Sequence, residues 1–236
     1  MVRAVFRWRS LVLSVVIPTL NAATTLAEVL DGFLPGLGEG DLEVIVVDGA
    51  SSDETCALAQ SGGAIIISAP RGRGGQLSAG AKAARGDWLL FLHADTVLSA
   101  DWREEAAHFM ANPENTMRAG VFRLALDDGA TAARRLEALA AWRARVFGLP
   151  YGDQGLLIGR AFYQSIGGFR SLPLMEDVDL ARRIGRARFV HLGAEARTSA
   201  WRYRRSGYVR RSARNLICLG LYFLGVKPRF LVRLYG

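Results

Sequence analysis

The chain has 236 residues, of which 50% are apolar and 22% are charged. This composition is typical of a globular protein with a substantial core and excludes a disordered chain. The two cysteines, Cys56 and Cys218, lie far apart and form no CxxC pair. Their spacing excludes a disulfide framework and a thiolate zinc site, and it favours a reducing compartment.

The formal net charge of +8 is concentrated at the C-terminal end. Residues 197–236 contain nine Arg, one Lys and no acidic residue, so the preceding 196 residues carry 8 − 10 = −2 on the same count. A basic segment of this kind can contact nucleic acid, anionic lipid or a phosphorylated substrate. It can equally be a solvated face of an arginine-rich protein.

Residues 1–16 resemble a signal peptide superficially, because basic residues precede an apolar stretch. That stretch runs into Pro18 without a convincing cleavage site, so a first core strand is the expected structure. No segment reaches the roughly 18 to 20 apolar residues that a membrane span requires. The expected location is the cytoplasm, with peripheral attachment at the inner face of the cell membrane left open.

The first 126 residues alternate between strand and helix patterns. Strands are predicted at 11–17, 42–47, 64–68, 88–92 and 120–126, and helices at 22–34, 53–60, 75–84 and 99–111. Asp53 and Ser99 are the candidate N-caps. The second to fourth strands are continuous apolar runs, which is typical of a parallel sheet covered on both faces. The alternation predicts right-handed βαβ units and an α/β, doubly wound, mostly parallel sheet.

The pattern changes after residue 126. The segments that follow are a long helix at 130–147, a glycine-rich strand and turn at 152–159, a short helix ending at Gly167-Gly168, a helix in "LMEDVDLARRI" and an amphipathic helix from Ser206 to Tyr222. Repeats and low-complexity linkers are not evident. We therefore expect one domain with a C-terminal helical elaboration.

Polar residues follow four successive predicted strands. Asn21 follows the first strand, close to Pro18; Asp48 and Asp53 follow the second, Arg71 and Arg73 the third, and His93 and Asp95 the fourth. Ligands of open α/β sheets bind at the carboxyl ends of the strands. The recurrence therefore predicts a ligand site at this edge.

The glycine-rich segment "RGRGG" at 71–75 precedes a predicted helix, so its N–H groups and arginines could hold phosphate. Glycine clusters more often mark simple turns. Neither GxGxxG after the first strand nor GxxxxGK[ST] occurs, so the fingerprints of a dinucleotide fold and of a P-loop are absent. Asp95 could bind Mg²⁺ or Mn²⁺ bridging a diphosphate, or it could cap the next turn.

Three carboxylates lie at the start of a predicted helix in "MEDVDL" at 175–180. Glu176 and Asp179 share one helical face, while Asp177 points elsewhere. Favourable interaction of acids with a helix N-terminus would explain the cluster equally well. In the nearby "GDQG", Asp153 and Gln154 lie between glycines, as in a loop.

Taken in order, the blocks "SVVIPTLNAA", "EVIVVDGASSD", "APRGRGGQLSAGA", "GDWLLFLHADT", "GGF" and "MEDVDL" resemble family 2 glycosyltransferases of the GT-A fold. More narrowly, "LLFLHADT", "YGDQG" and "LGLYFLGVKPRFLVRLYG" look like the subgroup labelled radical-SAM/selenodomain-associated transferases. The resemblance implies a Rossmann-like sheet and an inverting transfer that depends on Mn²⁺ or Mg²⁺. The sugar would move from a nucleotide-diphospho-sugar to a hydroxyl acceptor, which could be linked to a lipid.

The resemblance also implies roles for individual residues. Nucleotide-sugar binding falls to Pro18, Asn21, Asp48, Arg71, Arg73, His93 and Arg202, with Asp53 as a weaker candidate. The segment His93-Ala94-Asp95 occupies the position of the DxD motif, so Asp95 is the expected metal ligand. Asp177 matches the catalytic base and Glu176 its support, while Asp153 and Gln154 are assigned to the acceptor side. His191 is a candidate for an additional metal ligand.

His93 stands where the family's first aspartate would be, and a neutral imidazole brings no negative charge. A weaker or more selective metal site is expected. Two other function classes stay open: a non-catalytic nucleotide-sugar-binding protein on the same fold, and a nucleotidyltransferase. The latter would be expected to have a glycine-rich loop after the first strand, where this sequence has "PTLNAATT".

We expect three functional parts within the single domain. They are a nucleotide-sugar-binding part at about 10–126, an acceptor and catalytic part at about 127–205, and a basic amphipathic segment at about 206–236. The last part can lie on an anionic membrane surface, pack on the catalytic core or form a homodimer contact. Nucleic acid is not an expected partner, because no RNA-binding motif accompanies the arginines and aromatics.

Overall fold

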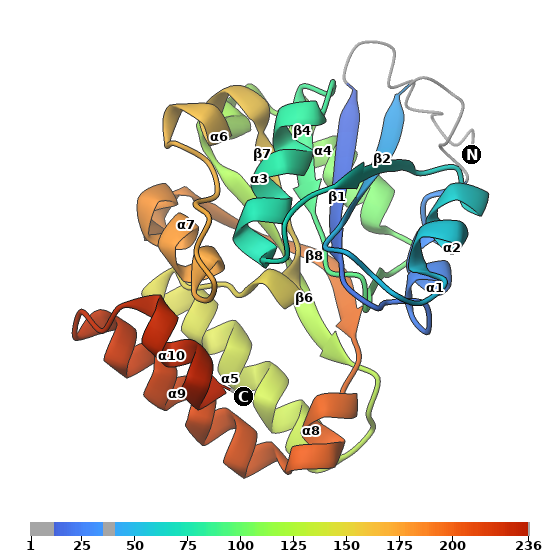
Figure 1. Ribbon diagram of the computed structural model, residues 1–236. Coiled ribbons are helices and arrows are strands. Elements are labelled where there is room, and N and C mark those ends of the chain that lie inside the picture. The colour runs from blue at the N-terminus through green and yellow to red at the C-terminus, as the bar shows by residue number, and fades with distance from the viewer. Residues whose placement is uncertain (1–11, 35–40, 236) are drawn as a thin grey trace.

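The computed structural model describes residues 12–34 and 41–235. Its centre is an eight-stranded, mostly parallel sheet with the strand order β3-β2-β1-β4-β7-β6-β8-β5 (Figure 1). The strands are β1 Leu13–Thr19, β2 Leu42–Asp48, β3 Ile65–Ser68, β4 Trp88–Phe91, β5 Thr96–Leu98, β6 Ala119–Leu126, β7 Leu156–Gly159 and β8 Phe189–Thr198. The five predicted strands are confirmed with small shifts at their ends; residue 11 of the first lies outside the described residues.

Helices cover both faces of this sheet. They are α1 Leu26–Asp31, α2 Thr55–Ser61, α3 Arg73–Ala83, α4 Trp102–Ala111, α5 Thr131–Phe147, α6 Arg160–Ser165, α7 Glu176–Ile184, α8 Trp201–Ser206, α9 Tyr208–Phe223 and α10 Pro228–Tyr235. Short 3₁₀ helices lie at Pro113–Met117, Gly152–Gln154 and Arg186–Arg188. The predicted helices are confirmed, whereas α8 and α10 were not expected, nor were β5 and β8.

The first half is a parallel sheet buried on both faces. β1 pairs in parallel with both β2 and β4, and β2 with β3, so their carboxyl ends share one edge. Along β1, Val15 and Ile17 pack into the core with α1 and α4, while Val16 packs into the opposite core with α3 and α6. Two-sided burial explains why these strands appear in the sequence as continuous apolar runs.

The second half extends the sheet with mixed pairings. β7 is antiparallel to β4 and β6, β6 is parallel to β8, and β5 is antiparallel to β8. In β8, buried residues alternate with exposed ones, including Arg197. Because of this alternation, which Gly193 interrupts, the sequence has no continuous apolar run here and the strand was not predicted. Thr198, the last residue of β8, lies beside Asp95.

The two predicted N-caps are wrong. Helix α2 begins at Thr55, and the Asp53 carboxylate accepts N–H bonds from Thr55 and from Ala23 in the loop after β1, each at 3.1 Å. Helix α4 begins at Trp102, and the Ser99 hydroxyl accepts the Glu195 N–H at 2.8 Å. Both side chains therefore link two segments of the fold.

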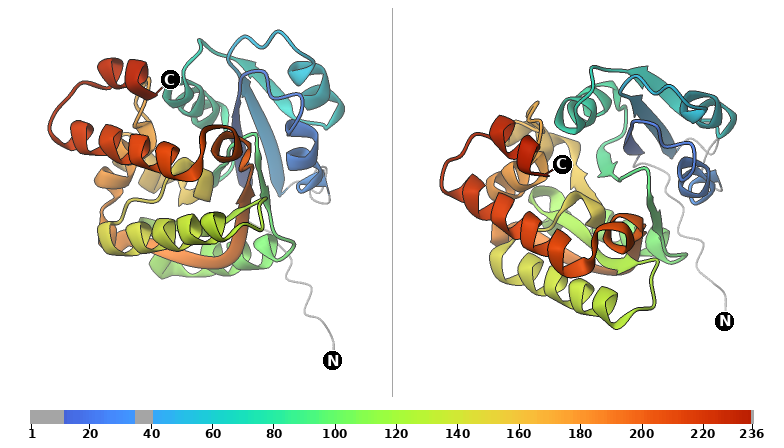
Figure 2. Two further views of the ribbon diagram at one scale, coloured as in Figure 1. Left: turned by 90° about the horizontal axis from the view of Figure 1, so that it is seen from below. Right: turned by 60° about the horizontal axis from the view of Figure 1, so that its bottom comes forward.

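The C-terminal helices lie below the sheet in Figure 1, and the view from below in Figure 2 shows α9 running beside α5. Cys218 of α9 and Leu231 of α10 are buried against Leu174, Met175 and Val178 around the start of α7. The expected helical elaboration thus packs against the start of α7. Among the described residues, no helix combines the length and apolar character that crossing a membrane requires.

Helix α3 approaches the sheet closely at Gly80. A Cβ atom there would lie 2.3 Å from Val16 Cγ1 and 2.8 Å from Val47 Cγ2. At Gly75 of the same helix, a Cβ atom would meet Ser171 Oγ at 3.6 Å, an ordinary contact. The two glycines therefore differ in the packing that surrounds them.

We expect Gly80→Ala to lower the free energy of unfolding by about 1 to 3 kcal/mol through overpacking, partly offset by better helix propensity. Gly75→Ala, the matched control, should raise it by up to about 1 kcal/mol. Urea unfolding followed by circular dichroism measures both. Equal stabilisation by the two substitutions would contradict the close approach.

Candidate active site

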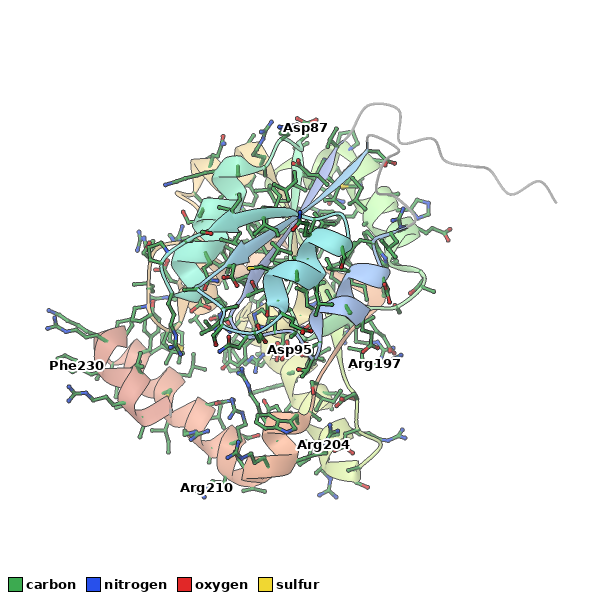
Figure 3. The ribbon with its side chains drawn as sticks, turned by 45° about the vertical axis from the view of Figure 1, so that its right-hand side comes forward. Asp87, Asp95, Arg197, Arg204, Arg210 and Phe230 are labelled. Atoms are coloured by element: carbon green, nitrogen blue, oxygen red, sulfur yellow. The ribbon has the colours of Figure 1, made fainter. Side chains whose placement is uncertain are left out.

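A cleft opens at the edge where the parallel strands end, facing α8 and α9. It is lined by Arg73, His93, Asp95, Tyr151, Gly152, Asp153, Leu174, Met175, Asp177, Val178, Thr198, Ser199, Arg202, Tyr203, Arg211 and Asn215. Figure 3 shows Asp95 at this edge, whereas Asp87, at the other end of β4, lies at the top of the molecule. Residues from distant parts of the chain thus share one concave surface.

The loops after β1 and β2 are bonded to each other beside this cleft. Buried Asp48 accepts hydrogen bonds from the Thr19 hydroxyl at 3.0 Å and from the Ser51 N–H at 2.9 Å. Asn21, with a positive φ of 50°, accepts the Ser52 N–H at 2.9 Å. These contacts fix the two loops relative to one another.

Electrostatics keeps Asp48 ionised. Burial works to raise its pKa, but hydrogen bonds from Ser51 and Thr19 outweigh burial and lower the pKa below its ordinary value. A carboxylate held charged and oriented at the end of β2 suits the recognition of a hydroxyl or an amide of a ligand. Pro18, Asn21, Asp48 and Asp53 all lie at this end of the sheet, but none of them lines the cleft itself.

Gln76 of α3 holds the carboxyl ends of β1 and β2 together, and it was not identified from the sequence. Its amide group donates to the carbonyls of Thr19 at 2.8 Å and Val47 at 2.7 Å, so α3 clamps the ends of β1 and β2. A Cβ atom at Gly49 would lie 3.0 Å from the Gln76 Nε2 atom. The glycine that follows Asp48 therefore leaves room for this clamp.

An ion pair joins the two halves of the site. Arg73, the first residue of α3, donates its Nε–H to the buried carboxylate of Glu176, the first residue of α7. At neighbouring Gly74, a Cβ atom would lie 2.2 Å from the Arg170 carbonyl oxygen. Only a glycine lets the start of α3 approach the segment before α7 this closely. Arg71, by contrast, is exposed and does not line the cleft.

His93 lies between these halves as a neutral imidazole. Burial, together with the positive charges of Arg73 and Arg202, holds the pKa of His93 well below its ordinary value. Its Nε2 atom lies 3.5 Å from Arg73 Nη1, and a Cβ atom at Gly152 would come within 2.5 Å of the same nitrogen. The ring therefore offers a lone pair rather than a charge.

Asp95 is anchored by its backbone while its carboxylate faces the cleft. Its carbonyl oxygen accepts the Ser199 N–H at 3.2 Å and the Thr198 hydroxyl at 3.3 Å. The same hydroxyl lies 3.5 Å from Oδ1 of the carboxylate. Thr198, at the end of the unexpected strand β8, is the residue that positions Asp95.

Asp177 faces the same cleft from the N-terminus of α7. Its Oδ2 atom accepts the Gly152 N–H at 3.1 Å, and its Oδ1 atom accepts the Val178 N–H at 2.8 Å. The preceding Met175 adopts a left-handed conformation with a φ of 64°, a strain found in functional segments. Asp179 instead pairs with Arg170 and Arg183, so the three acids of "MEDVDL" have three different surroundings.

Asp153 and Gln154 are neighbours in the chain but have different surroundings. Asp153 lines the cleft. Burial raises the pKa of its carboxyl group to about 6, although the positive charge of Arg143 acts in the opposite direction. The negative charges of Asp177 and Asp95 add to the rise. Gln154 is buried outside the cleft lining, where its amide group contacts the Phe122 carbonyl at 3.3 Å and the Tyr151 N–H at 3.4 Å. Gln154 therefore holds the 3₁₀ turn against β6.

His191 does not join the site. It lies exposed on β8 seven residues before Thr198, or roughly 23 Å along an extended strand. The proposal of His191 as an extra metal ligand is therefore wrong. Arg202 does line the cleft, and with it come Tyr203, Arg211 and Asn215 from α8 and α9, which sequence reasoning missed.

Comparisons with known proteins agree with this arrangement. The model of the family described as "Glycosyl transferase family 2" matches residues 14–172, more than half of the chain. The match ends before "MEDVDL", so the assignment of Asp177 depends on the geometry described above.

Curated relatives cover part of the chain. A PGL/p-HBAD biosynthesis glycosyltransferase of Mycobacterium tuberculosis is 38% identical over 109 residues, which are 43% of this chain and 42% of that protein. A glycosyltransferase of Rickettsia bellii is 38% identical over 71 residues, 30% of this chain and 24% of that protein. The chain thus matches about two fifths of the length of the first relative.

Solved structures share the fold. Glucosyl-3-phosphoglycerate synthase from Mycobacterium tuberculosis, in complex with Mn²⁺ and UDP-glucose, has a TM-score of 0.57 at 21% identity over 81% of this chain and 70% of that chain. A mannosyltransferase from Pyrobaculum calidifontis, in complex with GDP-mannose and Mn²⁺, has a TM-score of 0.59 at 21% identity over 84% of this chain and 61% of that chain. The sheet, the site at its edge and the family match lead to one conclusion: this chain is a member of glycosyltransferase family 2 with a GT-A fold.

Proposed function

We propose that the protein transfers a sugar, with inversion at the anomeric carbon, from a nucleotide-diphospho-sugar to a hydroxyl group of an acceptor. The observation that carries this proposal is the meeting of Asp95 and Asp177 in one cleft with Arg73 and Arg202. An inverting displacement needs a base for the acceptor proton and positive charge for the departing diphosphate. The cleft contains candidates for both.

Asp177 is the proposed base. The Gly152 and Val178 N–H groups orient its carboxylate without burying it, so an acceptor hydroxyl can approach from the cleft. The base takes the hydroxyl proton as the acceptor oxygen attacks the anomeric carbon. Glu176 supports this residue through its ion pair with Arg73, which holds the start of α7 in place.

Arg73 and Arg202 are the proposed partners of the diphosphate. Both line the cleft next to His93, which stays neutral and can accept a hydrogen bond from a ribose hydroxyl. Asp48, Asn21, Pro18, Asp53 and Arg71 would contact the nucleoside from the loops at the ends of β1 to β3. This division corresponds to a donor part at about 10–126 and an acceptor part at about 127–205.

A divalent cation, Mn²⁺ or Mg²⁺, fits the residues of the site. Asp95 presents a carboxylate and His93 a neutral nitrogen, both of which are ligands for such ions. Within the described residues, no group of three His, Cys, Asp or Glu side chains would cage a metal by itself. A cation here would share its coordination with substrate phosphates, and it would supply positive charge to the leaving group.

The outer face of the C-terminal helices supports attachment to an anionic membrane. On α9, Val209, Leu216, Ile217 and Phe223 are 48–83% exposed and recur at spacings that form one helical stripe. Phe230 extends the exposed apolar surface onto α10, at the outer edge of this layer (Figure 3). Because residues 197–236 contain ten basic residues and no acidic one, anionic lipid is the complementary partner. Such attachment fits a lipid-linked acceptor at the cytoplasmic face. Membership of the radical-SAM-associated subgroup stays a prediction from the sequence blocks alone.

We expect Asp177→Asn to reduce transfer by at least about a hundredfold, because the amide cannot take the acceptor proton. Binding of the nucleotide measured by calorimetry should stay within about twofold, since Asp177 is assigned to the acceptor. Turnover is followed as release of nucleoside diphosphate from UDP- and GDP-sugars with a panel of hydroxyl acceptors. Undiminished turnover by the variant would remove Asp177 from this role, and wild-type binding without turnover on any acceptor would favour the non-catalytic alternative.

Asp95→Ala should abolish the difference between nucleoside diphosphate affinities measured with Mn²⁺ and with EDTA. The reason is that the proposed cation loses its protein carboxylate. Asp87→Ala, which removes an exposed carboxylate at the opposite end of β4, is the matched control and should bind like the wild type. If the wild-type protein bound nucleotide equally well with and without metal, the cation proposal would fail.

Membrane attachment predicts sedimentation with vesicles of phosphatidylcholine and phosphatidylglycerol at low salt. Binding should fall as NaCl is raised, because salt screens the basic residues. The double substitution Leu216→Ser and Ile217→Ser should weaken binding by at least about tenfold through lost apolar burial. Met117→Ser, at an equally exposed apolar residue that follows α4, serves as control. Absence of sedimentation at low salt would leave homodimerisation as the use of this face.

A further inference from the structure

Helix α9 turns a polar pair of residues toward the cleft. Arg211, Asn215 and Cys218 follow one another at spacings of four and three residues, so they share one helical face. Cys218 is fully buried against Leu174, Met175 and Val178, which surround the start of α7. The face that seats α9 therefore also brings Arg211 and Asn215 next to the segment that carries Asp177.

The surroundings of these two side chains are those of a binding site. Arg211 is only 8% exposed although it lines the cleft, and its guanidinium lies 5.6 Å from the centre of the Tyr203 ring. Asn215 Oδ1 is buried and has no hydrogen-bond partner among the described residues. A partly desolvated guanidinium binds anions more strongly than an exposed one. The Asn215 Oδ1 atom can accept a hydrogen bond from a hydroxyl of the ligand, and the Nδ2 group of the same amide can donate to an oxyanion beside it.

The pair enters the cleft from a different element than Arg73 and His93 do. Arg73 and His93 approach the cleft from the edge of the sheet, whereas Arg211 and Asn215 approach from α9, on the side of Leu174, Met175 and Val178. Because Leu174, Met175 and Val178 flank Asp177 in the chain, a ligand group held by the pair would lie next to the segment that carries Asp177. This argument rests on the proposed function, which makes Asp177 the base.

We propose that Arg211 and Asn215 form a subsite for a phosphate group carried by the acceptor. The basic C-terminal segment, with no acidic residue after position 196, favours a phosphate over a neutral acceptor. The phosphate can belong to a lipid headgroup or to a soluble phosphorylated compound. Both sources present the same oxyanion to the same guanidinium.

The first test is calorimetric titration with inorganic phosphate, with and without saturating UDP or GDP and Mn²⁺. Arg211→Gln should weaken phosphate binding by at least about tenfold, the effect of losing a charge-assisted hydrogen bond. Arg210→Gln removes the same charge from the exposed side of the helix (Figure 3) and should change the affinity by less than about threefold. Circular dichroism checks that both variants are folded.

Several outcomes would overturn the subsite. They are the absence of phosphate binding, equal losses in Arg211→Gln and Arg210→Gln, and displacement of the phosphate by the nucleotide, which would assign Arg211 to the donor. Should Arg211→Gln fail to fold, Asn215→Ala tests the same site and should weaken phosphate binding while leaving Arg211 in place. Failure of every nucleotide to bind would count against the proposed function alone, since the phosphate titration is also made without nucleotide.

The second test distinguishes the two sources of phosphate. Vesicles of phosphatidylcholine with and without phosphatidic acid are titrated with the wild type, Arg211→Gln and Arg210→Gln. If the phosphate belongs to a lipid, Arg211→Gln should weaken binding to vesicles with phosphatidic acid more than Arg210→Gln does. Inorganic phosphate should then inhibit vesicle binding by the wild type. If the phosphate belongs to a soluble compound, Arg211→Gln should weaken the binding of inorganic phosphate. The two variants should then bind vesicles equally well. Absence of any dependence on Arg211 in both titrations would contradict the subsite.

Discussion

The ion pair between Arg73 and Glu176 is the contact on which the geometry of the site depends. It joins the first residue of α3 to the first residue of α7, and the close backbone approach at Gly74 makes it possible. Glu176 is 1% exposed, and burying a carboxylate is costly unless a positive charge accompanies it. Removing one partner of a fully buried pair typically costs about 3 to 5 kcal/mol, and the cost is smaller here because the Arg73 side chain is 34% exposed. The pair thus fixes the start of α7, and with it Asp177, relative to the start of α3.

The charges of the cleft form two groups with different tasks. Asp95, Asp153 and Asp177 bring negative charge together, and their mutual influence contributes to the raised pKa of Asp153, of about 6. A cation or a proton would relieve this repulsion, which is the electrostatic condition of a metal-dependent site. Arg73, Arg202 and Arg211 provide the positive charge that anionic ligands require. His93 lies between the groups and stays neutral, so replacing an aspartate by histidine lowers the negative charge without adding a positive one.

The two faces of α9 connect the chemistry of the cleft to the surroundings of the protein. Its inner face carries Arg211, Asn215 and Cys218, and its outer face carries an exposed apolar stripe with arginines at its margin. Under the proposals above, the outer face would contact the membrane and the inner face the phosphate of the acceptor.

The sequence by itself determined the parallel half of the sheet and most of the chemistry at its edge. Strands buried on both faces appear as continuous apolar runs, and the residues that follow them, such as Asp48 and Asp95, must lie at the carboxyl ends. Of the predicted site residues, the structure brings Arg73, His93, Asp95, Asp153, Asp177 and Arg202 into one cleft.

Only the tertiary structure decided which polar side chains are structural and which face the ligand. Gln154 and Asp53 bond to neighbouring backbone, and His191 lies far along β8, because hydrogen-bond partners and strand pairing are long-range properties. The shared helical spacing of Arg211, Asn215 and Cys218 was a signal in the sequence. The spacing alone does not show what this helical face contacts. That depends on the packing of α9 against Leu174 and Val178, which are distant in the sequence.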